Sequence, residues 1–125
     1  MSNSDNLTGL IVHGDGRGRS LGFPTANLTN IQGTPPQSGI YACWGRLNTD
    51  KQWYKAVMHS GPRPAVGDPK QSIEVYLLDF PDHDLYGQSL ECRNLIYLRA
   101  IKNFATLEDL KRAIAADCNQ ARALL

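Results

Sequence analysis

Short apolar stretches separated by turn residues fill most of the chain, and no helical pattern interrupts them before residue 105. Alternation and a high content of β-branched and aromatic residues predict strands over residues 7–13, 39–47, 52–59, 72–80 and 89–98. Proline- and glycine-rich segments over residues 28–38 and 60–71 are expected to be loops. Strands that follow one another without helices favour a small barrel or sandwich.

The stretch 72–80 shows the alternation most clearly. Ile73, Val75 and Leu77 fall on one side of the expected strand, and Glu74, Tyr76 and Leu78 fall on the other. In residues 89–98, the residues expected on one side are Leu90, Cys92, Asn94 and Ile96. Both patterns indicate half-buried strands of an antiparallel sheet.

The sequence period changes at Thr106, where a helix is expected to begin. Thr106 is a suitable N-cap, and Asp109 stands in the capping-box position, where Glu or Gln is more usual. An apolar stripe at helical spacing follows: Leu107, Leu110, Ile114, Ala121 and Leu124. Since no proline follows Pro81, one helix is expected to run almost to the C-terminus and to pack on the barrel.

Length and charge place the chain in a broad class. Its 125 residues are expected to form a single domain over 1–125, with residues 1–6 disordered. The net charge of +1 gives no argument for a nucleic-acid or membrane partner, and no apolar run approaches membrane-spanning length. Three widely spaced cysteines indicate reduced, buried thiols rather than disulfides or a zinc site. We therefore expect a cytoplasmic monomer.

A Gly/Arg-rich segment over residues 14–22 follows the first expected strand. Backbone N–H groups in such a segment can cradle a phosphate, and arginine guanidinium groups bind phosphate well. The segment is neither a Walker A loop nor a Rossmann turn. On composition alone, an ordinary glycine-rich turn remains the alternative.

Pro24 follows the Gly/Arg segment and holds the chain extended. Thr25 and Asn27 are two residues apart, so on an extended chain they point to the same side. A hydroxyl and an amide oxygen beside a phosphate site are suitable ligands for a hard cation such as Mg²⁺.

The segment over residues 9–28, with Phe-Pro-Thr-Ala-Asn after the Gly/Arg run, resembles the opening signature of the riboflavin kinase (flavokinase) family. The similarity continues to the C-terminus and is to the C-terminal kinase domain of the bacterial bifunctional riboflavin kinase/FMN adenylyltransferases. It implies a mainly β fold: a six-stranded antiparallel Greek-key barrel with a C-terminal helix packed on it. It also implies transfer of the γ-phosphate of ATP to riboflavin, giving FMN and ADP. No second motif suggests FAD synthesis.

The same resemblance assigns roles to individual residues. Residues 73–80 are similar to the family strand that carries a catalytic glutamate, which makes Glu74 the expected general base. Gly14, Arg19 and Thr25 would bind the ATP phosphates, and Thr25 and Asn27 would hold Mg²⁺. From the strand pattern alone, a solvent-facing Glu74 is the alternative. Arg17 is equally consistent with a phosphate contact and with a solvated loop position.

The resemblance also predicts that Arg99 and Phe104 contact the flavin, although a surface arginine at a strand end is an alternative. The chain departs from the family pattern at three positions: Ile101 replaces a usual Glu, His59 a usual Asn and Ala65 a usual Thr. These departures leave open a non-catalytic flavin- or nucleotide-binding module on the same fold. An oligonucleotide-binding barrel is a weaker alternative, because the net charge is near zero.

Overall fold

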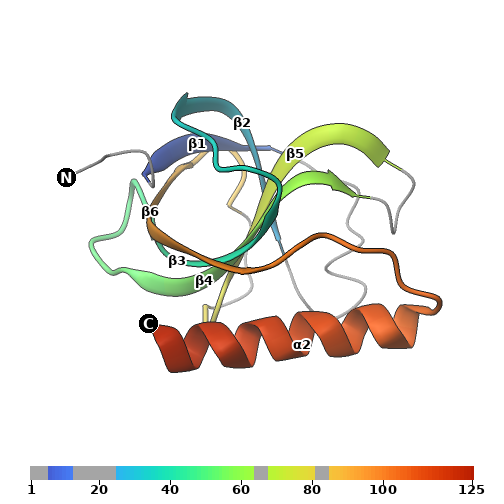
Figure 1. Cartoon of the computed structure of the whole chain (residues 1–125). Helices are drawn as coiled ribbons and strands as arrows, with labels where there is room; N and C mark the ends of the chain where they lie inside the picture. The colour runs from blue at the N-terminus through green and yellow to red at the C-terminus, as the bar shows by residue number, and fades with distance from the viewer. Residues whose placement is uncertain (1–5, 13–24, 64–67, 81–84) are drawn as a thin grey trace.

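A computed structural model describes residues 6–12, 25–63, 68–80 and 85–125, and shows a closed antiparallel barrel with one helix beside it (Figure 1). The strands are β1 (Leu7–Val12), β2 (Ala26–Gly33), β3 (Gly39–Leu47), β4 (Tyr54–Arg63), β5 (Asp68–Leu77) and β6 (Ser89–Arg99). Around the barrel they follow the order β1-β2-β5-β4-β3-β6. The helix α2 spans Leu107–Leu124. The expected mainly β fold, with six strands and a C-terminal helix, is confirmed.

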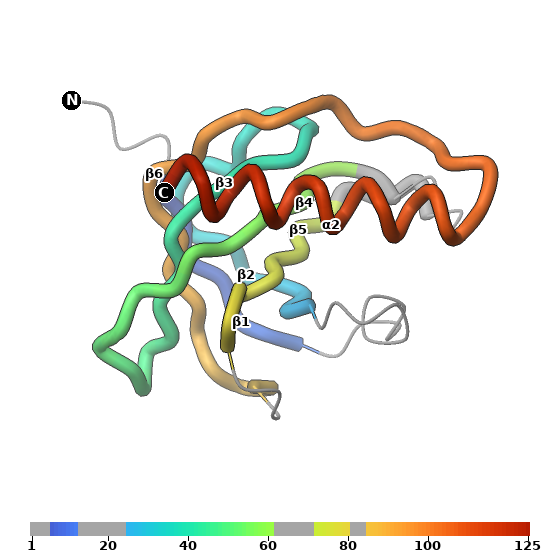
Figure 2. The backbone as a smooth tube through the Cα atoms, turned by 90° about the horizontal axis from the view of Figure 1, so that it is seen from below, coloured from blue at the N-terminus to red at the C-terminus, as the bar shows by residue number. Residues whose placement is uncertain are grey.

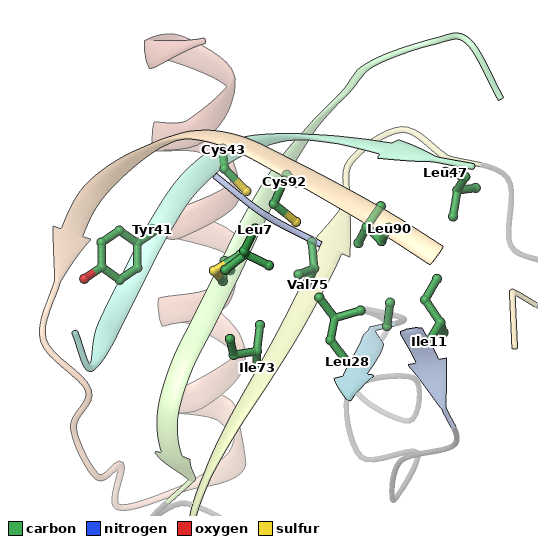
Figure 3. Close-up of a cluster of buried hydrophobic side chains, with 13 residues drawn as sticks. Leu7, Ile11, Leu28, Tyr41, Cys43, Leu47, Ile73, Val75, Leu90 and Cys92 are labelled. Carbon is green, nitrogen blue, oxygen red and sulfur yellow. The ribbon is translucent and has the colours of Figure 1, made fainter. Parts of the chain in front are cut away.

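The barrel interior is filled by alternate residues of every strand (Figure 3). The cluster includes Leu7, Ile11, Ala26, Leu28, Tyr41, Cys43, Met58, Ile73, Val75, Leu90 and Cys92. Because side chains alternate along a strand, the residues between these positions must lie on the outer face of the barrel. Cys43 and Cys92 are fully buried here, and Cys118 of α2 is buried between the helix and the barrel, so all three thiols are buried as expected.

The helix α2 covers one part of this outer face, against β3 and β4 (Figures 1 and 2). Ile114, Cys118 and Ala121 of the helix pack with Ile40, Ala42, Val57 and Leu78 in a second buried cluster. Thr106 is the N-cap, as predicted, and its hydroxyl accepts a hydrogen bond of 3.0 Å from the Asp109 backbone N–H. No helix among the described residues combines the length and apolar character that crossing a bilayer requires.

Two segments expected to be loops contain strand. Residues 28–33 belong to β2, and β4 and β5 extend to residues 63 and 68. A register shift between Gly61 and Arg63, with Gly61 at φ +126°, takes up the irregular backbone in this pairing. A bulge of this kind lets a glycine- and proline-containing sequence stay in a sheet, so turn composition alone was misleading.

The expected side-chain pattern fails in the second half of β6 and at the two ends of α2. Asn94 has a φ of +59°, and the pairing of β6 with β3 shifts register between Trp44 and Ala42. The bulge moves Ile96 out of the row of Leu90 and Cys92, and Ile96 is 38% exposed. In α2, Leu107 and Leu124 are also exposed, whereas Leu110, Ile114 and Ala121 of the expected stripe pack against the barrel.

Candidate active site

One row of directly paired residues crosses the outer face of the barrel. Glu74 of β5 lies between Asn27 of β2 and His59 of β4, and each of these two residues is its backbone partner. The row continues from His59 to Ile40 of β3, and from Ile40 to Arg99 of β6. Directly opposed residues on one face have Cβ atoms about 4.5–5.5 Å apart. The barrel therefore places Asn27 and Glu74, which were both predicted as site residues, side by side.

Glu74 faces outward but is not in solvent. Its neighbours in β5, Ile73 and Val75, point into the barrel, so Glu74 must point out. It is nevertheless only 9% exposed. The solvent-facing alternative for this carboxylate is therefore wrong, because Glu74 lies on the outer face of β5 and is still largely buried. A largely buried carboxylate on the outer face of a strand is unusual, which makes Glu74 a candidate functional residue.

Tyr76 lies close enough to Glu74 and to residues of α2 for their charges to affect its pKa. It lies two residues after Glu74 on the same face of β5 and packs against the cluster beneath α2. Burial is the main reason that the pKa of the Tyr76 phenol is raised. The charges of Glu74, Cys118 and Asp117 raise this pKa further, and Arg99 opposes them. The phenol therefore stays neutral, close to groups from β5, β6 and α2.

Arg99 is held by the helix rather than free in solvent. Its Nε and Nη2 donate hydrogen bonds of 2.9 and 2.8 Å to the two carboxylate oxygens of Asp117. Nη1 donates to the backbone oxygen of Ala100 at 3.1 Å, and the guanidinium lies 5.7 Å from the centre of the Phe104 ring. Arg99 is thus a partly exposed arginine at a strand end that is anchored to α2, and the two residues predicted to bind flavin lie together. Their contact with flavin remains a prediction.

The predicted phosphate and metal ligands are only partly described. Thr25 is half-buried and lies directly before β2, two residues from Asn27. Gly14 and Arg19 lie outside the described residues, as do Arg17 and Ala65. Oxygen ligands suit Mg²⁺, and the hydroxyl of Thr25 and the amide oxygen of Asn27 are ligands of this type, so these two residues fit such an ion.

Sequence reasoning missed Asp117 and Tyr76 and gave His59 only as a departure from the family pattern that could be a ligand contact or incidental. A signal for Asp117 was available, because it lies in helical phase with Ile114 and Ala121 and therefore on the buried stripe. An acidic residue in such a stripe needs a cationic partner. For His59, the needed information was the strand register, which a single sequence does not define.

Two pockets on the described surface include none of the residues of this row. One, of about 400 Å³, is lined by Arg46, Asp50 and Glu91 among others. The second, of about 390 Å³, is lined by Trp44, Trp53, Arg93 and Asn94. Neither contains a predicted site residue. The candidate site is therefore defined by converging side chains rather than by either of these hollows.

The fold and the row define a class of protein. It is a small closed barrel with one helix packed on its outer face, and this face also carries a largely buried carboxylate next to an amide. The profile of the family described as riboflavin kinase (Flavokinase) matches residues 2–125. The chain belongs to this family.

Individual relatives agree with the family match. The bifunctional riboflavin kinase/FMN adenylyltransferase of Escherichia coli K12 is 38% identical over 116 residues, which are 93% of this chain and 36% of that protein. The RNA-binding riboflavin kinase RibR of Bacillus subtilis is 36% identical over 113 residues, 89% of this chain and 47% of that protein. The riboflavin kinase structure from Trypanosoma brucei superimposes with a TM-score of 0.70 at 23% identity. The superposition covers 96% of this chain and 78% of the Trypanosoma brucei chain, and it shows that the two proteins share a fold. This chain spans about a third to a half of these two curated relatives.

Proposed function

We propose that this chain is a riboflavin kinase, which transfers the γ-phosphate of ATP to the ribityl 5′-hydroxyl of riboflavin and releases FMN and ADP. The observation that carries the proposal is the direct pairing of Asn27 with the buried Glu74, in a chain that belongs to the riboflavin kinase family. These residues supply a cation ligand and a base on neighbouring strands.

Glu74 acts as the general base. Its carboxylate accepts the proton of the 5′-hydroxyl while the hydroxyl oxygen forms a bond to the γ-phosphorus and the bond from phosphorus to the ADP oxygen breaks. A phosphoryl-transfer site needs positioning and charge neutralisation more than covalent chemistry. A carboxylate shielded from water in a covered face is well suited to this role, because its orientation is fixed before substrate binds.

Thr25 and Asn27 would hold Mg²⁺, which neutralises charge on the ATP phosphates when it is bound. Gly14, Arg19 and Thr25 would contact the phosphates themselves. Arg99 and Phe104 would bind the flavin, with Arg99 fixed in place by Asp117. An aromatic ring and a guanidinium plane are both suitable surfaces for a flat ring system.

The departure from the family pattern at Ile101 has a structural counterpart. Ile101 packs against the cluster beneath α2, and a Cβ added at Gly61 would lie 2.9 Å from its Cδ1 atom. The side chain therefore contributes packing where a glutamate would contribute charge. The packing of Ile101 stabilises the connector between β6 and α2. The replacement of the usual glutamate is therefore compatible with a catalytic chain.

The test is product formation. The purified chain is incubated with riboflavin, ATP and MgCl₂, and FMN is measured by chromatography, with EDTA as the control. We expect FMN that disappears when EDTA is in excess over the metal. Bound riboflavin without any FMN would contradict the proposal and favour the non-catalytic binding module.

A further inference from the structure

We propose that His59 orients the carboxylate of Glu74 and is a positioning residue for phosphoryl transfer. The inference rests on the proposed function, in which Glu74 is the base. It is carried by the strand register, because His59 of β4 is the direct backbone partner of Glu74 of β5.

The register places both side chains on one face. Met58, which precedes His59, is fully buried in the barrel interior, as is Val75, which follows Glu74. His59 and Glu74 therefore both point outward from neighbouring strands, with Cβ atoms about 4.5–5.5 Å apart. At this separation of the Cβ atoms, the imidazole of His59 and the carboxylate of Glu74 can reach each other. His59 is itself half-buried, which restricts the ring positions open to it.

The outer backbone partners of this pair of strands are uncharged. On β2 the partner of Glu74 is Asn27, which carries no charge. On β3 the partner of His59 is Ile40, which is apolar.

The ionisable groups packed nearby have other partners or stay neutral. Arg99 of β6 is joined to Asp117 of α2 by two hydrogen bonds. Tyr76 of β5 and Cys118 of α2 both have a raised pKa, caused chiefly by burial, and stay neutral at ordinary pH. Among the described residues, His59 is thus the ionisable side chain paired directly with the carboxylate across the strands.

Nδ1 of His59 is buried and makes no hydrogen bond with the described residues, so the donor to one oxygen of the Glu74 carboxylate would be the Nε2–H of a neutral imidazole. The second oxygen then remains available to accept the proton of the attacking hydroxyl. Without this donor the carboxylate can rotate, and fewer molecules hold the productive geometry. Asparagine retains an N–H donor at this position, whereas alanine does not.

The kinetic test is a double-mutant cycle with FMN formation as the readout. We expect His59→Ala to lower kcat about tenfold with little change in KM for riboflavin, and His59→Asn to restore most of the loss. In a Glu74→Gln background, His59→Ala should cause no further loss, because the group that it orients is already gone. Lys55→Met, on the same strand and the same outer face, is the matched control and should retain wild-type kcat.

An equal loss from His59→Ala in both backgrounds would overturn the inference and indicate a structural role. Absence of FMN in the wild-type chain would instead overturn the proposed function, and the pair is then read directly by NMR. At about pH 8, above the ordinary imidazole pKa, the ring ¹⁵N shifts report which nitrogen carries the proton. The chain has three histidines, and His59→Asn identifies the right signals. We expect Glu74→Gln to change these shifts; unchanged shifts would overturn the inference.

Discussion

Arg99 and Asp117 are joined by two parallel hydrogen bonds, of 2.9 and 2.8 Å, between the end of β6 and the middle of α2. Asp117 is 4% exposed, so the pair lies largely out of water. The connector over residues 100–106 starts at this arginine and contains Phe104, whose ring lies beneath the same guanidinium. The pair therefore fixes both the helix and the residues predicted to contact flavin.

Asp117→Asn should lower the free energy of unfolding by about 1–3 kcal/mol, because it leaves the Arg99 charge poorly compensated. The loss is smaller than for a fully buried ion pair, since the Arg99 side chain is partly exposed to water. Urea unfolding measures this change. Arg93→Gln, which breaks the more exposed ion pair with Glu91, is the control and should cost less than about 1 kcal/mol. Equal losses for the two variants would contradict the anchoring role of Asp117.

Phe104→Ala should weaken riboflavin binding by about 1–2 kcal/mol, roughly five- to thirtyfold in Kd, if the ring stacks on the flavin. Quenching of riboflavin fluorescence measures the Kd. Leu107→Ala removes an exposed apolar side chain at the start of α2 and serves as the control. An unchanged Kd for Phe104→Ala would remove Phe104 from the flavin site.

Asn27→Ala should raise the Mg²⁺ concentration needed for half-maximal FMN formation by about tenfold or more, because it removes one oxygen ligand. Thr29→Ala is the matched control, since residue 29 lies two positions further along β2 and on the same face. A shift of equal size in both variants would show that disturbance of β2, rather than loss of a ligand, is responsible.

The alternation of short strands and the change of period at Thr106 predicted a small barrel or sandwich with a C-terminal helix. Most of β2 fell in a segment expected to be a loop, and the six-stranded barrel was implied by the family resemblance. The sequence patterns were not enough to predict the burial of Glu74. Alternation assigns a residue to the outer face, but whether that face meets water depends on where the helix and its connector lie. The bulge at Asn94 also has no clear sequence signal, and it reverses the side on which Ile96 appears. The site was predicted through the family resemblance, and its geometry required the strand register.

Burial raises the pKa of the Cys118 thiol from near 9 to about 11. The folded chain therefore holds this proton more tightly than the unfolded chain does. The contribution to the free energy of unfolding is fully present below about pH 9 and is lost as the pH rises towards 11. Cys118→Ala should lose less stability than the wild type between about pH 8.5 and 10.5. The same slope in both proteins, measured by urea unfolding, would show that Cys118 makes no such contribution.

The most direct test of the account is Glu74→Gln, which keeps the size of the side chain and removes the base. We predict that kcat for FMN formation falls by about 10²–10⁴, while the Kd for riboflavin stays within about threefold of the wild type. Glu91→Gln, on the outer face of β6 and paired with Arg46 and Arg93, is the control and should retain wild-type kcat. A Glu74→Gln variant that forms FMN at close to the wild-type rate would contradict the assignment of Glu74 as the general base.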